Sequence, residues 1–386
     1  MSYMGFFPYH ILSCIEFKNL INGGNEKRES LLIKIMKKLL GLFSILLIVL
    51  IVSTSCTKVD STSKGEASQT VKQRQWKIAF IAGGLFGDQG MNDAMLKGVK
   101  DFSDKSGIKV TSVEVSESGD TMINANNFAE QNYDLVLMGS NYSDVIGETA
   151  EAYPKTTFII NKGSVHGDNL VSVKFNEPDG AFLAGAYAAL LTKELGGKPT
   201  IGWVGGMRIP DLEISKFAFK AGAKVFGVDT NTVYIGDFKD SAKSKEITLQ
   251  MYNDGIKVVQ SFCGGAASGV YQAAESQPEG NYALGSATGQ FHMSDKIVAS
   301  QVVNYDIYYQ QILASFVENN GEIDSQLLEG TLANGGVGIK YSPKHQDVAT
   351  KEMREKIESL KQKVINKEIK VPTSEESFNK FSYKVE

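Results

Sequence analysis

The residues best suited to binding chemistry lie in one glycine-rich stretch, "FIAGGLFGDQGMND", from Phe80 to Asp93. An apolar run leads into glycines that flank a single carboxylate, Asp88, and a helix is expected to begin directly after them. A dinucleotide fingerprint requires G-x-G-x-x-G and a phosphate loop requires G-x-x-x-x-G-K-[ST], and the stretch matches neither pattern. Because Asp88 would also stand where an anion should bind, we expect no phosphate site here.

Catalysis by Asp88 would require a partner acid, base or nucleophile. The sequence contains no Ser/His/Asp order, nucleophile elbow or H-x-E site. We therefore expect Asp88 and Asn92 to hydrogen-bond a polar, uncharged ligand, because a charged acceptor contributes more than a neutral one in a desolvated cleft. Phe86 or Met91 would cover an apolar face of that ligand. For Asn92 the alternative is that its side chain caps the helix that begins there.

The N-terminal region has the build of a lipoprotein signal. In "MKKLLGLFSILLIVLIVSTSC", Met36 to Cys56, two lysines precede an apolar run of about 14 residues, shorter than the roughly 20 that a spanning helix needs. Small residues then lead to Cys56, which resembles the lipidated cysteine of a lipobox; the alternative is a buried structural cysteine. Met36 reads as a start residue, so residues 1–35 are expected to lie outside the natural product. Residues 57–75 are polar and predict a flexible tether.

Composition excludes several classes of function. Residues 1–56 hold six basic and three acidic side chains, so the remaining chain has 34 basic and 41 acidic residues and a net charge of −7. That balance, with no basic stretch, argues against nucleic acid as a partner. Cysteines and histidines show no metal-ligand spacing, so neither a metal site nor a disulfide framework is expected.

From Trp76 onward, short β-branched runs alternate with longer amphipathic stretches, which is typical of βαβ units and a parallel sheet. Strands are predicted at 77–82, 109–115, 134–139, 156–161, 170–175, 200–205, 231–235, 257–262, 282–286 and 297–302. Helices are predicted near 91–106, 121–131, 143–152, 179–195, 211–226, 240–254, 266–276 and 304–319. Apolar spacing at Met353, Ile357, Leu360 and Val364 predicts a further helix, packed on its lobe or, alternatively, binding a partner.

About 300 residues exceed what one core comfortably holds, so two α/β domains are expected. No linker separates them, which predicts that the chain crosses between the domains more than once. Glycines follow several strands, at Gly83, Gly139, Gly205 and Gly264. Since ligands bind beyond the carboxyl ends of strands in open α/β sheets, these glycines are expected to line one cleft.

The chain resembles the basic membrane protein family of lipoproteins, typified by purine nucleoside receptors of ABC importers. Motifs that carry the resemblance follow in order: "GLFGDQGMNDAMLKGVKDF", "YDLVLMGSNYSDVIGETAEAYPKTTFII", "NLVSVKFNEPDGAFLAGAYAALLT", "IGWVGGMRIPDLEISKFAFKAGAK", "SAKSKEITLQMYNDGIKVVQSFCGGAASGVYQAA" and "LANGGVGI". They span about Trp76 to Pro372. The resemblance implies a type I periplasmic-binding-protein fold, in which two doubly wound parallel-sheet lobes are joined by a multi-crossing hinge. The expected boundaries are 76–174 with 303–322 for the first lobe, 175–299 with 326–372 for the second, and 373–386 for a tail.

The resemblance also implies a ligand-binding set. Asp88 and Asn92 match the family's aspartate and asparagine, Phe219 matches an aromatic that stacks on a base, and Gly264 and Gly265 match a turn whose amides reach the ligand. For Phe219 the alternative is core packing at helical spacing. The full expected set is Phe86, Asp88, Met91, Asn92, Ser140, Asn141, Asn161, Phe219, Gly264 and Gly265.

Several positions depart from the family pattern. Met91 stands where phenylalanine is usual and Asn161 where an aspartate is common. Ala287 and Gly289 occupy the places of two acids, and Val303 that of a lysine. Since the acid and the lysine form much of the family's ribose clamp, an ordinary nucleoside should bind poorly unless other groups compensate.

The function expected from the sequence is that of a lipid-anchored substrate-binding protein, on the extracytoplasmic side of the cell membrane, without catalysis or cofactor. Its expected partners are a small-molecule ligand, an ABC permease and the lipid bilayer through Cys56, and it is expected to be a monomer. A purine nucleoside or related nucleobase-type solute is the favoured ligand. Riboflavin, as another flat heterocycle, is the alternative, followed by a small-molecule enzyme on the same fold.

Overall fold

The computed structural model describes residues 74–87, 90–116, 118–139, 143–323 and 327–383, all within the unit Gln73–Glu386. Its strands form two sheets of six. The first sheet contains β1 (Ile78–Ile81), β2 (Val110–Val113), β3 (Leu135–Met138), β4 (Thr157–Asn161), β5 (Leu170–Phe175) and β11 (Leu327–Gly330). The second contains β6 (Thr200–Gly205), β7 (Asp229–Tyr234), β8 (Val258–Phe262), β9 (Tyr282–Gly285), β10 (Ile297–Val303) and β12 (Val337–Tyr341). The ten predicted strands are therefore present, and β11 and β12 are additional.

Both sheets have the same doubly wound order. The first runs β11-β5-β4-β3-β1-β2 and the second β12-β10-β9-β8-β6-β7, and every pairing is parallel except that of β12 with β10. Strand order reverses beside β1 in one sheet and beside β6 in the other, and such switch points create a crevice at the carboxyl ends of the strands. The expected α/β class with two doubly wound, mostly parallel sheets is confirmed.

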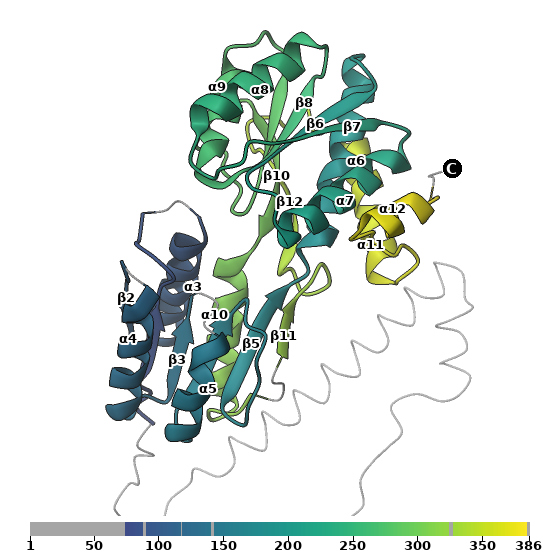
Figure 1. The fold of residues 1–386 in the computed structure, drawn as a ribbon. Helices are drawn as coiled ribbons and strands as arrows, with labels where there is room; N and C mark the ends of the chain where they lie inside the picture. The colour runs from purple at the N-terminus through teal and green to yellow at the C-terminus, as the bar shows by residue number, and fades with distance from the viewer. Residues whose placement is uncertain (1–73, 88–89, 117, 140–142, 324–326, 384–386) are drawn as a thin grey trace, which may run out of the picture. The chain divides into compact units, whose positions relative to one another are not determined.

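Helices cover both faces of each sheet (Figure 1). Around the first sheet lie α3 (Met91–Ser106), α4 (Ser118–Glu130), α5 (Ser143–Ala152) and α10 (Tyr305–Glu318). Around the second lie α6 (Glu177–Leu195), α7 (Pro210–Val225), α8 (Ser241–Asn253), α9 (Ala267–Glu275), α11 (Lys351–Ile365) and the short α12 (Glu375–Lys380). Helices α8 and α9 share one face of the second sheet, and α6 and α7 pack on the other.

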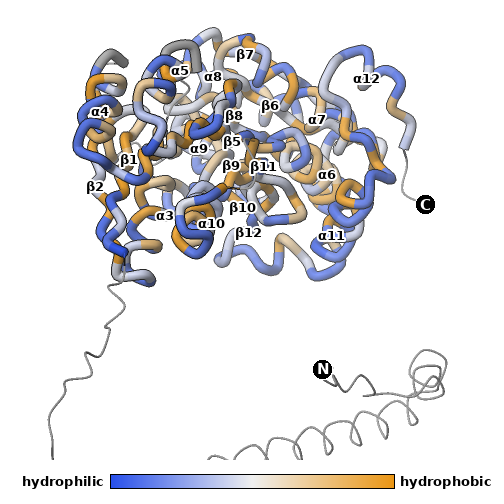
Figure 2. Tube along the Cα trace, turned by 90° about the horizontal axis from the view of Figure 1, so that it is seen from below, coloured by the Kyte–Doolittle hydropathy of each residue, from blue (hydrophilic) through white to orange (hydrophobic). Residues whose placement is uncertain are grey.

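Burial of the strand residues agrees with the helices that lie on both faces of each sheet. Strands β1 and β3 are buried along their whole length, as parallel strands between two helical layers should be. Figure 2 shows hydrophobic and hydrophilic segments alternating along the outer helices. In α11 the buried residues are Met353, Ile357, Leu360 and Val364, so its apolar stripe packs on the second sheet's helices, against α6.

The chain passes between the sheets three times, at Asn176, at Asn304 and through 331–336. The third passage differs from the sequence-based expectation, which put it between 322 and 326 and assigned all of 326–372 to the second lobe. Strand β11 instead pairs with β5 in the first sheet. Its sequence, LLEG, is short and half-exposed, so it carries no apolar run that predicts a strand. The remaining lobe boundaries stay a prediction.

Candidate functional site

A cleft lies where the carboxyl ends of the strands in both sheets meet the starts of their helices. Its central cavity has a volume of about 320 Å³. The walls are formed by Met91, Lys162, Glu177, Ile209, Asp211, Leu212, Phe238, Phe262, Gly264, Ser286, Ala287, Gln301, Val303 and Tyr305. Two further cavities adjoin it. One, of about 600 Å³, shares Lys162, Glu177 and Asp211, and the other, of about 280 Å³, shares Val303.

The loop after β1 is held in place by side chains around it. The amide of Gly83 donates to Asn92 Oδ1 at 2.9 Å, that of Phe86 to Glu114 Oε2 at 2.8 Å, and that of Gly87 to Asp93 Oδ1 at 2.7 Å. Gly87 has a φ of 89°, which favours glycine at this position.

Asn92 therefore has a structural role that neither sequence-based alternative described. The N-cap of α3 is Gly90 and no side chain caps it, so the capping alternative for Asn92 is wrong. Asn92 is 8% exposed and its Oδ1 accepts the loop hydrogen bond. Phe86 is half-buried beside Phe80, with ring centroids 6.3 Å apart, and Asp88 lies outside the described residues.

Met91 and Asn161 are brought together, as the expected site required. Asn161 is fully buried; its Nδ2 lies 2.9 Å from Met91 Sδ and 3.2 Å from Gly139 O, and its Oδ1 accepts from the Tyr309 hydroxyl at 2.8 Å. Met91 lines the central cavity, whereas Asn161 is enclosed behind it. Asn161 therefore helps to position Met91, while the side-chain amide of Asn161 itself contacts only protein groups among the described residues.

Phe219 does not line the cleft. It is fully buried in the apolar core, where α6 and α7 approach closely because Gly185 and Gly222 have no side chains. A Cβ on Gly185 would collide with the Phe219 carbonyl oxygen. Core packing, the alternative interpretation of its helical spacing, is the one that the structure supports.

Two other aromatic side chains line the central cavity, Phe238 and Phe262. Phe238 follows β7 and packs over Gly206 and Gly264, where a side chain would collide with its ring or touch it. Phe262 ends β8 and stacks on Trp203 with centroids 6.0 Å apart and an interplanar angle of 25°. Sequence reasoning missed both, although the glycines that follow β6 and β8, Gly206 and Gly264, are the signal that marks room for the Phe238 ring.

Gly264 lines the central cavity, as expected, with a φ of 60° at the start of a 3-10 turn (Gly264–Ala266). Gly265 is the next residue of that turn. Ser140, Asn141 and Cys56 lie outside the described residues.

The positions that depart from the family pattern also face the cleft. Ala287 and Val303 line the central cavity and Gly289 the adjoining one. The Val303 amide donates to Ala287 O at 2.8 Å, and Ala287 has a φ of 65°, a conformation uncommon for residues other than glycine. Ala287 and Val303 therefore present apolar side chains where an acid and a lysine were expected from the family pattern, while the adjoining cavity beside them is also lined by charged residues such as Asp306 and Lys340.

The opposite end of the central cavity is charged. Lys162 Nζ lies 2.7 Å from Glu177 Oε1, so an ion pair joins the residue after β4 to the first turn of α6. Burial alone would lower the pKa of Lys162, but the carboxylates of Glu177 and Asp211 raise it above its ordinary value. Burial raises the pKa of the neighbouring Tyr305 hydroxyl. This end thus combines the Lys162–Glu177 ion pair with the side chains of Asp211 and Tyr305.

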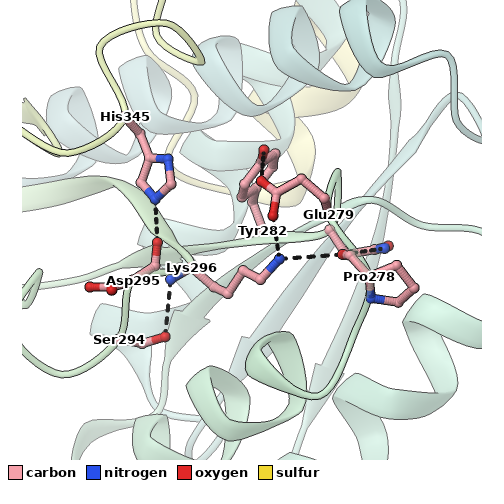
Figure 3. A network of polar contacts seen from close by, with 8 residues as sticks. Pro278, Glu279, Tyr282, Ser294, Asp295, Lys296 and His345 are labelled. Carbon is pink, nitrogen blue, oxygen red and sulfur yellow. Dashed lines mark hydrogen bonds and ion pairs between the residues drawn. The ribbon is translucent and has the colours of Figure 1, made fainter.

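Another polar network lies at the opposite ends of the same strands (Figure 3). Glu279 accepts from the Tyr282 hydroxyl at 2.7 Å and pairs with Lys296 at 3.1 Å, and His345 contacts the carbonyl of Asp295. Glu279, Tyr282, Asp295 and Lys296 precede or begin β9 and β10, and His345 follows the antiparallel β12, so the network lies at the amino ends of β9 and β10, away from the cleft. None of these residues lines the central cavity or the two adjoining ones.

Over residues 74–383, apart from the undescribed gaps, no helix has the length and apolar content to cross a membrane. Within the same residues, no three His, Cys, Asp or Glu side chains gather as a metal site would require.

Comparison with known proteins identifies the family. A family described as "ABC transporter substrate-binding protein PnrA-like" matches residues 75–375. Basic membrane protein A of Borreliella burgdorferi is 28% identical over 343 residues, covering 87% of this chain and 98% of that protein. Among solved structures, a solute-binding protein of an ABC transporter system from Aeropyrum pernix K1 shares the fold with a TM-score of 0.64 at 20% identity, covering 80% of this chain and 96% of that one. A solute-binding protein from Conexibacter woesei has a TM-score of 0.65 at 18% identity, with 77% and 99% covered. Substrate-binding proteins of ABC transporters are extracytoplasmic, are not enzymes, and bind a small molecule and an ABC permease. The chain belongs to the PnrA-like, basic membrane protein family of these proteins.

Proposed function

We propose that this protein captures a purine nucleoside or a related nucleobase-type solute for import. The observation that carries the proposal is the pair of aromatic side chains, Phe238 and Phe262, in the wall of a cavity that also holds the charged residues Lys162, Glu177 and Asp211. A flat ring gains about 1–3 kcal/mol per base from stacking on an aromatic side chain. Phe238 and Phe262 take over the stacking role that the sequence assigned to Phe219.

The size of the cavity favours a compact ligand. Its volume of about 320 Å³ is at the lower end of the range of about 300–1,000 Å³ for ligand pockets. Riboflavin, with three fused rings and a long chain, is the second candidate, supported by the loss of the family's acid and lysine at Ala287 and Val303. It would have to extend into an adjoining cavity.

Ligand capture is proposed to close the two lobes about the three chain passages near Asn176, Asn304 and 331–336. Hinge closure around a ligand is a known motion of such receptors. Small-angle scattering at saturating ligand should then show a smaller radius of gyration, and an unchanged radius would contradict closure.

Cys56 is proposed to carry the lipid that keeps this monomeric receptor at the membrane. The support is the sequence pattern at 36–56, since these residues are not described in the structure. Mass spectrometry of the mature protein should find an acylated N-terminal Cys56, and Cys56→Ala should lose the acyl mass. An unmodified N-terminus elsewhere would refute the anchor.

Binding is tested by two measurements on the purified protein. Native mass spectrometry should detect a co-purified small molecule, and calorimetry should rank inosine, guanosine, adenosine, the free bases and riboflavin. Phe238→Ala and Phe262→Ala should each weaken the best ligand by about tenfold or more, as loss of stacking requires. The matched control, Phe226→Ala at the far end of α7, should leave affinity unchanged. If wild type binds none of these compounds, the proposed ligand class is wrong.

A further inference from the structure

The charged end of the cleft contains an ion pair that connects the two sheets. Lys162 follows β4 of the first sheet, and Glu177 begins α6, which packs on the second. Lys162 has a φ of 56°, and it is one of two non-glycine residues with positive φ in the central cavity, Ala287 being the other. Such backbone conformations cost free energy and occur preferentially at ligand sites. The lysine is therefore held in an unusual conformation from which its ammonium meets Glu177.

Asp211 lies beside this pair in the first turn of α7. Asp211 lines both the central cavity and the larger adjoining one, and it is exposed. Among the described residues, none forms a hydrogen bond or an ion pair with its carboxylate, although the charge of Asp211 contributes to the raised pKa of Lys162. Lys162 forms its ion pair with Glu177, at 2.7 Å, and not with Asp211.

The other carboxylates that line the three cavities are engaged. Asp93 accepts from the Gly87 amide at 2.7 Å, and Asp306 lies 3.3 Å from Lys97. Glu177 is paired with Lys162. Among the described residues that line these cavities, Asp211 is consequently the acidic residue whose two carboxylate oxygens are both available to a ligand.

An ionised carboxylate only accepts hydrogen bonds, and its two oxygens match two adjacent donors. We propose, on the basis of the proposed function, that Asp211 determines ligand specificity by accepting two neighbouring hydrogen bonds from the solute. Two parts of a nucleoside offer this chemistry: the ring edge of guanine, with its N–H and amino group, and the vicinal hydroxyls of ribose. Asp211 then supplies, at the charged end, the acceptor that is missing at Ala287.

The experiment is calorimetric titration of wild type, Asp211→Ala and Asp211→Asn with guanosine, inosine, 2′-deoxyguanosine, adenosine and riboflavin. Asp211→Ala should weaken the best nucleoside by about tenfold or more, because hydrogen bonds to charged groups are the strong ones. Asp211→Asn, which keeps the shape but offers one donor and one acceptor, should bind with intermediate affinity. Asp229→Ala, at the exposed amino end of β7, is the matched control and should bind as wild type does.

The ligand series distinguishes the two sources of donors. If the ring edge binds Asp211, wild type should prefer guanosine to inosine and tolerate 2′-deoxyguanosine. If the ribose binds Asp211, wild type should bind guanosine and inosine alike and bind 2′-deoxyguanosine more weakly than guanosine. In either case the preference should disappear in Asp211→Ala. Tight binding by wild type with unchanged affinity and preference in Asp211→Ala would refute the inference alone. Absence of binding by wild type to every compound would refute the proposed function and the inference with it.

Discussion

Tyr309→Phe tests the network that positions Met91 in the cleft. The Tyr309 hydroxyl donates to Asn161 Oδ1 at 2.8 Å, and both residues are fully buried. The substitution removes the only donor that the described residues direct to this oxygen, while the ring and its packing remain. Asn161 Oδ1 is then left inside the core without a hydrogen bond.

The expected loss follows from that geometry. A buried polar group left unsatisfied costs about 1–3 kcal/mol, more than the net contribution of an ordinary hydrogen bond. With an unfolding entropy of about 2.1 cal/mol/K per residue, a folded unit of about 300 residues should lose roughly 2–5 °C in Tm. Urea unfolding and calorimetry, both without ligand, measure the change.

Tyr187→Phe provides the matched control. Tyr187 is also fully buried, but its hydroxyl has no hydrogen-bond partner among the described residues. Removing that hydroxyl should leave the free energy of unfolding unchanged or raise it, because the folded state no longer buries an unsatisfied group. If the two substitutions cost the same, the loss does not depend on the hydrogen bond to Asn161, and the argument from the Asn161 network is refuted.

Two further predictions concern the cleft and pH. Ala287→Asp should tighten binding of inosine by about tenfold but should not change binding of hypoxanthine, because it restores an acid near the expected ribose. Aspartate also tolerates the φ of 65° at this position better than alanine does. Ala287→Asn is the control, and equal gains in affinity for inosine and hypoxanthine would contradict a ribose clamp at this position. Although burial raises it, hydrogen bonds from Lys216, Tyr234 and Arg208 hold the pKa of Glu213 at about 2. This stabilisation, up to about 3 kcal/mol, is present above the unfolded pKa near 4.5 and is lost as pH falls towards 2, so the stability gap between wild type and Glu213→Gln in urea should narrow from pH 7 to pH 3; a constant gap would contradict it.

Most strands and helices were predictable because the residue patterns that determine them lie within short stretches of the sequence. Strands such as β3, with the sequence LVLM, are buried on both faces and are therefore continuous apolar runs. Helix α11 shows its packing face as a repeat of apolar residues. These patterns predicted ten strands and the principal helices within a few residues of their observed bounds.

Strands β11 and β12 were not predictable in the same way. β11 reads LLEG and is half-exposed, and β12 reads VGIKY and pairs antiparallel at the edge of its sheet. An edge strand needs no apolar residue on both faces, so nothing in its composition distinguishes it from a loop. Without β11, the third chain passage was placed before this strand instead of after it.

The aromatic wall shows a second limit. Phe219 and its neighbours in α7 have helical spacing that fits either a core or a ligand face, and the decision depends on where α6 lies. Close packing of α6 and α7 through Gly185 and Gly222 puts Phe219 in the core. Phe238 and Phe262 come from different loops and strands, so only the topology brings them together.

The charged end of the cleft could not be recognised from the sequence, because its acidic residues also fit a common feature of helix starts. Acidic residues are common in the first turn of helices, where they complement the helix dipole, so Glu177 and Asp211 look like ordinary helix starts in the sequence. Their proximity arises because α6 and α7 both begin at the cleft, opposite the residue that follows β4. A dipole role and a ligand role are therefore compatible for Asp211: an acidic side chain suits the start of a helix, and Lys162 forms its ion pair with Glu177 rather than with Asp211.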